Sequence, residues 1–198
     1  MNQCSQCGQL VQNSDNYCFR CGAEIEKYPL PAGFWIRFGA HFIDGLIFLP
    51  LIILVFSNLY LFKNSALLIL IALPSFLYKP LMESIYGATL GKMACGIKVI
   101  DNMGQKLDMG TAFLRALPFL LSTFMGTLQS LMLYSSAEFQ SATTLEEIGQ
   151  LQQTGPMDIV VYVVNLFVLV DCIIAAFTYR KRTLHDMLAG SYCVYKER

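Results

Sequence analysis

The sequence predicts a mainly α-helical membrane protein: a polytopic bundle of four transmembrane helices, a small cytoplasmic β-sheet and a cysteine-rich N-terminal domain. Three observations predict this fold. Charged residues make up 14% of the 198 residues, whereas a soluble domain carries about 25%. Long uncharged apolar stretches recur along the chain, and two cysteine pairs stand near its start. The same composition, with a net charge of zero, excludes a disordered chain, a collagen and a basic nucleic-acid-binding protein.

The uncharged stretches set the positions of the four predicted spans. A helix needs about 20 mostly apolar residues to cross a bilayer, because each residue advances about 1.5 Å through roughly 30 Å of hydrocarbon. The stretches without charge, apart from Asp171 in the last, are 45–62, 65–78, 116–137 and 159–179. We therefore expect spans at about 34–60, 65–86, 113–135 and 158–179. A re-entrant or core helix is the alternative for the second.

The basic residues predict the orientation, because lysine and arginine collect in loops that stay in the cytoplasm. They gather between the second and third spans and directly after the fourth, at Lys92, Lys98, Lys106, Arg115, Arg180, Lys181 and Arg182. The segment 135–157 contains three glutamates and no base. We expect the middle loop and both termini in the cytoplasm, and no cleavable signal ahead of the first span.

Two C-x-x-C-G units, Cys4–Gly8 and Cys18–Gly22, predict a metal site. The glycine after each pair permits the positive φ that lets backbone N–H groups point at sulfur. Four thiolates on two such turns form a tetrahedral site that suits structural Zn²⁺ and leaves no open position for catalysis. We therefore expect a zinc ribbon at 1–26, with the ligands Cys4, Cys7, Cys18 and Cys21. Rubredoxin-like iron and a dithiol redox pair are the alternatives.

A linker at 27–33 joins the predicted ribbon to a transmembrane domain at 34–195. The ribbon resembles the short zinc ribbons at the N-termini of many bacterial membrane and regulatory proteins. It either docks a protein partner or acts as a folded cap. We do not expect it to bind nucleic acid, because Arg20 is the only base among the first 26 residues.

Charged side chains inside the first predicted span are the leading candidates for a functional site. Arg37, His41 and Asp44 lie at i, i+4 and i+7, on one stripe of a helix. Arg37 can reach toward the headgroups, while Asp44 lies about 10 Å deeper. A carboxylate at that depth is costly, so it should face the bundle and either find a partner or be protonated. His41 reads more simply as a hydrogen-bonded packing residue.

The second and fourth spans contain three further ionisable residues. Lys79 and Glu83 lie at i and i+4, so they can neutralise each other, and Pro80 between them is expected to kink the helix. Asp171 interrupts the fourth span. Two readings of the whole set stay open: structural ion pairs that fix helix packing, or a polar pathway for protons or small cations.

The loop after the second span is predicted to hold a β-hairpin rather than a nucleotide site. The run Gly87–Met93 has three residues between its glycines and no hydroxyl after Lys92, so it does not match a phosphate-binding loop. The segment 96–107 alternates β-branched residues around an Asn/Gly turn, which predicts the hairpin. A third strand is expected at 191–195, after a short helix that Thr183 caps with Asp186 at its third position. Asp186 is either that cap alone or also a functional residue.

These residues resemble the RDD family of bacterial membrane proteins, which is named for one arginine and two aspartates. The resemblance rests on Ala32–Arg37 with Asp44, on Gly87–Val99 and on Arg182–Gly190. By motif match the arginine falls on Arg37 and the aspartates on Asp44 and Asp186. Similar proteins often have like residues at the positions of Glu83, Lys92 and Arg115, and His185 belongs to the last of the three motifs. The zinc ribbon lies outside this family pattern.

The resemblance implies a multi-pass protein of the bacterial inner membrane that is suspected of transport, and some relatives look like monovalent cation/proton antiporters. The transport hypothesis assigns Asp44 as the carboxylate that binds a proton or a cation in turn, with a homo-oligomer enclosing the pathway in the lipid bilayer. The alternative is a non-transporting membrane adaptor that recruits a protein partner through the ribbon. We do not expect an enzyme, because the sequence contains no activated nucleophile and no ligand pattern around its two histidines.

Overall fold

The computed structural model describes residues 2–4, 6–12, 15, 17–24, 29–153, 157–178 and 181–196. The chain divides into two compact units, Met1–Leu30 with Lys196–Arg198, and Pro31–Tyr195. Each unit is described by itself. Arg180, one of the basic residues used to predict the orientation, and the end of the predicted fourth span lie outside the described residues.

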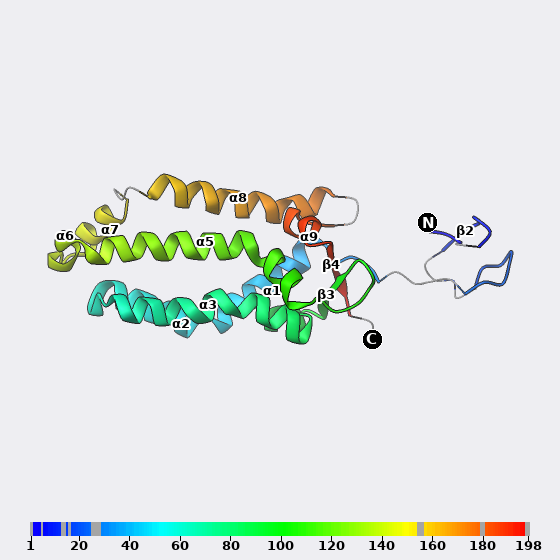
Figure 1. Ribbon diagram of the computed structural model, residues 1–198, viewed down its shortest axis with the longest axis horizontal. Coiled ribbons are helices and arrows are strands. Elements are labelled where there is room, and N and C mark those ends of the chain that lie inside the picture. Colours follow the sequence, from blue (N-terminus) through cyan, green and yellow to red (C-terminus); the bar gives the residue numbers. More distant parts are fainter. Residues whose placement is uncertain are drawn as a thin grey trace. The chain divides into compact units, whose positions relative to one another are not determined.

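The larger unit is a bundle built around three long helices, α3 (Ser65–Tyr86), α5 (Met109–Ser135) and α8 (Asp158–Phe177). They lie side by side with α5 in the middle (Figure 1). All three are long and apolar enough to cross a membrane. α3 has the predicted bounds. α5 begins four residues before its predicted start, because the Asp108 side chain caps it by accepting from the Thr111 N–H.

The first predicted span is divided into two helices. α1 (Phe34–Ile47) is followed by α2 (Leu49–Ser57) and a π-helical turn, η1 (Asn58–Phe62). The direction changes by 55° between Phe34–Ile47 and Leu49–Phe62. Pro50 explains the break, because proline lacks the N–H that would continue α1 and its ring clashes with the preceding turn. Among the described residues, three helices can therefore cross a membrane, or four if the bent pair is one span.

The outer surface of the bundle is apolar. In the most apolar 18-residue window of α3, α5 and α8, only 17%, 11% and 11% of the residues are buried. Large apolar side chains face outward along all three helices, among them Leu70, Phe124 and Val163. A soluble protein rarely exposes apolar surface so continuously. These helices indicate a membrane protein, with lipid around the bundle.

A two-stranded antiparallel sheet closes one end of the bundle (Figure 1). β3 (Ile97–Asp101) pairs with β4 (Ser191–Tyr195), with Val99 opposite Cys193. The predicted hairpin at 96–107 is wrong, because the chain after β3 forms a tight turn and not a second strand. The Asp101 carboxylate accepts the N–H groups of Met103 and Gln105 in this turn. Leu107 is then buried against Val99, so its side chain enters the core and not a ladder.

Short helices complete the two ends of the bundle. α4 (Leu90–Ala94) and α9 (Leu184–Leu188) lie at the end that carries the sheet, and Thr183 caps α9 as predicted. α6 (Ala137–Ser141) and α7 (Leu145–Gln153) lie at the opposite end (Figure 1). There Phe139 and Ile148 are fully buried against Tyr134 of α5 and Leu59 of η1, forming a small core.

The smaller unit contains a minimal sheet, in which β1 (Asn2–Gln3) pairs with β2 (Leu10–Val11). Tyr17 and Glu24 form an isolated antiparallel bridge. Gly8 and Gly22 have φ values of 69° and 70°, the left-handed conformation expected after each cysteine pair. Val11 is the only large aliphatic side chain buried among the described residues of this unit, so the cysteines supply most of its core.

Candidate functional site

A buried ionic network lies at the end of the bundle that carries the sheet. Arg37 of α1 contacts Asp186 of α9 at 2.5 Å, and Arg115 of α5 contacts the same carboxylate at 2.6 Å. Arg115 also contacts Glu83 of α3 at 2.5 Å, and Lys92 of α4 pairs with Glu83 as well. The five side chains are at most 9% exposed. The network therefore joins three helices of the bundle to two short helices.

Arg115 is the central residue of this network. Its Nη1 donates to Glu83, its Nη2 to Asp186, and its Nε to Asp186 and Ser191 at 3.1 Å each. A guanidinium group suits this position because its planar fork can serve two carboxylates at once. Ser191 is a partner that the sequence analysis did not single out. Its position between the predicted short helix and the predicted strand was the one hint in the sequence that it could lie near Asp186.

Asp186 has both roles that the sequence left open. It completes the cap of α9, where its Oδ2 accepts the Thr183 N–H, and it also receives Arg37 and Arg115. Burial by itself would raise the pKa of this carboxyl group. The two guanidinium groups outweigh burial and hold the pKa well below its usual value. Asp186 is therefore a permanent anion that links the C-terminal segment to α1 and α5.

His185 and Asp171 form a second buried pair beside the network. The ring Nδ1 of His185 contacts Asp171, and the His185 backbone N–H donates to the same carboxylate at 3.0 Å. Burial, the largest influence, lowers the pKa of His185 to about 4 against the opposing effect of Asp171; Lys79 and Arg115 lower it further. His185 is therefore a neutral imidazole at pH 7 that orients its helix on α8.

Asp44 lies next to the network but is held in a different way. Its Oδ1 accepts from the Tyr78 hydroxyl and from the Gly91 N–H, and its Oδ2 accepts from the Thr89 hydroxyl, each at 2.7 Å. The residue is 9% exposed. In the described part of the chain no lysine, arginine or histidine forms an ion pair with it. Asp44 is thus a buried carboxylate surrounded by neutral donors.

The close approach of α4 to α1 makes this arrangement possible. A Cβ on Gly91 would lie 2.0 Å from the Ala40 carbonyl oxygen and 2.9 Å from the Asp44 nitrogen. Only glycine lets the backbone of α4 come near enough to donate to Asp44. Tyr78, Thr89 and Gly91 could not be recognised in the sequence as partners of Asp44, because they come from other elements of the fold.

Lys79 does not pair with Glu83 as the sequence suggested, because Lys92 and Arg115 occupy that carboxylate. The Lys79 Nζ atom is buried without a hydrogen-bond partner in the described residues. It lies 3.1 Å from the centroid of the Phe119 ring, a cation–π contact. His41 is exposed at the side of α1, and its ring centroid is 6.1 Å from that of Phe119. The three polar residues of the α1 stripe therefore have three different surroundings.

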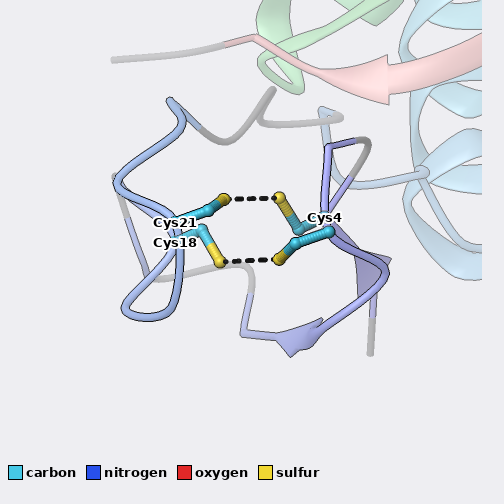
Figure 2. A group of neighbouring side chains, drawn as sticks. Cys4, Cys18 and Cys21 are labelled. Carbon is cyan, nitrogen blue, oxygen red and sulfur yellow. Dashed lines mark hydrogen bonds between the residues drawn. The ribbon is translucent and has the colours of Figure 1, made fainter.

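The four cysteines of the small unit form a cluster of the expected kind. Their Sγ atoms all lie within 4.8 Å of one another. The Cys4–Cys21 and Cys7–Cys18 Sγ distances are 3.6 Å and 3.5 Å, and Figure 2 shows both pairs of sulfur atoms facing each other. Ligands at about 2.3 Å from a tetrahedral zinc ion would lie about 3.8 Å apart. The donor set therefore fits a tetrahedral metal ion.

The backbone around the cluster favours thiolates. N–H groups of Cys7 and, to a smaller extent, Gln6 lower the pKa of the Cys4 thiol to about 6. A similar pair of N–H groups, from Cys21 and Arg20, lowers the pKa of Cys18. Cys21 differs, because the Ala23 N–H lowers its pKa but burial and the neighbouring thiols outweigh that effect and raise the pKa to about 12. A metal ion binds the thiolate form, so the turns favour binding at Cys4 and Cys18, and the ion itself must displace the proton of Cys21.

Comparisons with known proteins place the larger unit in a family. Residues 31–190 match the RDD family. The chain is 28% identical over 171 residues to the uncharacterized protein YckC of Bacillus subtilis (strain 168), covering 83% of this chain and 85% of that protein. It is 32% identical over 117 residues to the uncharacterized protein YxaI of the same organism, covering 46% of this chain and 78% of that protein. No solved structure matches the chain.

Proposed function

This chain belongs to the RDD family, and from that premise we propose that it exchanges a small monovalent cation for a proton, with Asp44 as the cation site. One observation carries the proposal. Asp44 is a buried carboxylate that receives three neutral donors and no cation among the described residues. Such a group has no ion-pair partner of its own, so a cation or a proton can bind directly to it.

The neighbours of Asp44 suit a small cation. Tyr78 and Thr89 each place a hydroxyl oxygen 2.7 Å from the carboxylate. A hydroxyl group donates its hydrogen when the site holds no cation, and it can rotate to offer a lone pair when a cation binds. The carboxylate and the two hydroxyl oxygens then supply an oxygen-rich site of the kind that hard cations prefer.

The charge balance of this end of the bundle suggests how a proton is coupled. The cations are Arg37, Lys79, Lys92 and Arg115, and the carboxylates are Asp44, Glu83, Asp171 and Asp186. Apart from Arg182, whose guanidinium group lies over the Tyr192 ring, four positive and four negative charges balance while His185 is neutral. A cation bound at Asp44 adds one positive charge, which the loss of one proton would restore to zero.

Lys79 is the group that can lose this proton. The other three cations each contact a carboxylate, whereas among the described residues the Lys79 ammonium group contacts only the Phe119 ring. Lys79 is adjacent in sequence to Tyr78, whose hydroxyl reaches Asp44. Their side chains leave α3 in different directions, Tyr78 toward Asp44 and Lys79 toward Phe119. The proposed coupling therefore acts through the total charge at this end of the bundle, where an added cation favours release of the Lys79 proton.

Flux through the purified protein tests the proposal. The full chain is reconstituted in liposomes with a pH-sensitive dye inside, and Na⁺, Li⁺ or K⁺ is added outside. We expect cation-dependent proton movement that Asp44→Asn abolishes. Tyr78→Phe and Thr89→Val should raise the half-saturating cation concentration several-fold, because each removes one oxygen ligand. Asp101→Asn, at the end of β3 and partly exposed, is the matched control that should keep the flux.

Two outcomes contradict the proposal. One is the absence of proton movement with every cation, from protein that is folded by its melting temperature. The other is wild-type flux in Asp44→Asn. Because Asp44 also holds α4 on α1, loss of flux in that variant counts only if the two hydroxyl variants change the cation dependence. Inhibition by Lys79→Met without loss of cation binding would support the assigned proton.

The small unit supports a second candidate function, recruitment of a protein partner. Tyr17 and Phe19, beside the second cysteine pair, are 64% and 76% exposed. Exposed aromatic side chains on a small rigid fold are typical of binding surfaces. We propose structural Zn²⁺ as the metal that holds this fold. We also propose an inner-membrane location with both termini in the cytoplasm, where the thiols of the small unit stay reduced. Capture experiments with the Tyr17→Ser/Phe19→Ser variant test the idea: partners bound equally by that variant and the wild type would contradict it.

A further inference from the structure

The middle of α8 carries a polar side chain on its surface. α8 has the highest mean hydropathy of the three long helices, 2.6, yet Asn165 lies exposed near its centre. The Asn165 Oδ1 accepts from the Ser122 hydroxyl of α5 at 2.7 Å. In the described residues its amide nitrogen donates to no partner. An amide that faces hydrocarbon without hydrogen bonds is unfavourable, so this surface requires a polar cover.

The surface of α5 beside Asn165 is shaped for a close helix contact. Ser122, Gly126 and Ser130 follow one another at intervals of four residues, so they lie along one face of α5. No atom lies within 4 Å of the position that a Cβ on Gly126 would take. The Ser130 hydroxyl is satisfied by the Gly126 carbonyl of its own helix. Small residues at this spacing allow another helix to approach closely in a membrane.

The described part of the chain offers no suitable cover for this surface. The one apolar helix of the described bundle that could act as a cover is α2, because it packs little against the other helices and none of its residues is buried. Its side chains are apolar apart from Ser57, whose hydroxyl donates to the Ile53 carbonyl. Lipid tails offer no hydrogen bond. The cover must bring a hydrogen-bonding group to the depth of Asn165.

A second copy of this chain meets that requirement. Two copies related by a two-fold axis along the membrane normal have the same depth, so residue 165 of one copy comes opposite residue 165 of the other. An asparagine side chain both donates and accepts, and two amides can therefore satisfy each other. Any other protein would need its own polar residue at the same depth and register.

We propose that Ser122, Gly126 and Ser130 of α5, with Asn165 of α8, form the docking surface for a second copy of the chain. In the symmetric dimer the two Asn165 amides hydrogen-bond each other, and the strip at Gly126 lets the helices approach. This proposal does not rest on cation exchange, because it follows from the polarity and shape of the α5–α8 surface alone. It gives the membrane protein a defined oligomeric state.

The test measures dimerisation of the full chain in liposomes. Donor and acceptor fluorescent proteins are fused to the C-terminus, and energy transfer is followed as the protein is diluted with lipid. We expect a saturable dimer in the wild type. Asn165→Val should weaken it at least tenfold by removing the amide, and Gly126→Ile should do so by blocking close approach. Asn165→Gln, which keeps an amide, should restore part of the affinity.

Controls separate dimer contacts from folding. Leu121→Ile alters an exposed residue of α5 outside the strip and should have no effect. Melting temperatures in detergent identify variants that fail to fold. The proposal is overturned if the wild type stays monomeric at every protein-to-lipid ratio, or if folded Asn165→Val and Gly126→Ile variants dimerise as the wild type does.

Discussion

At the scale of single residues, a few positions fix contacts that no other residue type could make. Gly91 is the clearest, because a methyl group there would overlap the Ala40 carbonyl oxygen at 2.0 Å. Arg115 is another, since one guanidinium group serves Glu83, Asp186 and Ser191 together. Both residues act across elements that are far apart in the sequence. Their importance therefore comes from tertiary contacts and not from local conformation.

Gly91→Ala should destabilise the protein by about 1–3 kcal/mol, because α4 must move away from α1 to make room. Gly39→Ala is the matched control. Gly39 lies within α1 with no atom within 4 Å of an added Cβ, so alanine there should stabilise the helix by about 0.5–1 kcal/mol. Thermal unfolding in detergent measures both. A melting temperature for Gly91→Ala at or above the wild-type value would contradict the packing described for α4.

Asp186→Asn should cost about 3–5 kcal/mol of stability, because it leaves two buried guanidinium groups without their shared carboxylate. Asp101→Asn changes a partly exposed carboxylate that, among the described residues, accepts only backbone N–H groups, and it should cost about 1 kcal/mol or less. Unfolding of the two variants side by side provides the comparison. Equal losses would mean that the ionic network adds nothing to stability.

At the scale of elements, apolar length predicted the helices well and predicted their breaks poorly. α3 has the predicted bounds, and the cap at Thr183 with the strand at 191–195 was also predicted. The break after Ile47 was missed, although Pro50 was visible in the sequence. The length of an uncharged stretch indicates whether the segment can cross a membrane. A single proline within it can still change the direction of the helix.

The site residues were predicted as a set but not as pairs. The sequence identified Arg37, Asp44 and Glu83 as charged residues inside predicted spans, and the family resemblance added Arg115 and Asp186. It paired Lys79 with Glu83 by their helical spacing, but Lys92 and Arg115 take that carboxylate through contacts that the fold creates. Pairing across elements depends on how the helices pack, and a single sequence does not contain that information.

The contact between α9 and α8 should make stability depend on pH. Burial lowers the pKa of His185 to about 4 in the folded protein, against about 6.5 in the unfolded chain. Between these values the unfolded chain binds a proton that the folded chain does not. The contribution of His185 is therefore complete above about pH 6.5 and is lost as the pH falls toward about 4.

Melting temperatures at pH 7.5 and pH 5 measure this dependence in the wild type and in His185→Asn. Asparagine keeps a donor toward Asp171 but does not titrate in this range. We expect a larger decrease in the wild type than in the variant. The same decrease in both proteins would show that other groups control the acid sensitivity.

At the scale of the whole molecule, the two compact units should respond separately to loss of metal. The cysteine cluster provides most of the core of the smaller unit, so a chelator, or Cys4→Ser with Cys18→Ser, should unfold that unit and remove about one zinc ion per chain. The melting temperature of the larger unit should stay within about 2 °C of the wild type. Metal analysis and unfolding of the same samples check both points. A large decrease in the membrane transition would show that the units are coupled.

The position of Asp186 near the end of the sequence also has a consequence for synthesis. The ribosome makes Arg37 and Arg115 long before it makes the carboxylate that both of them contact. Until residue 186 emerges, the nascent bundle contains cations whose shared counter-ion does not yet exist. The ionic network can therefore assemble only after residue 186 has been translated, and a chain stalled before that point would expose an incomplete structure to membrane proteases.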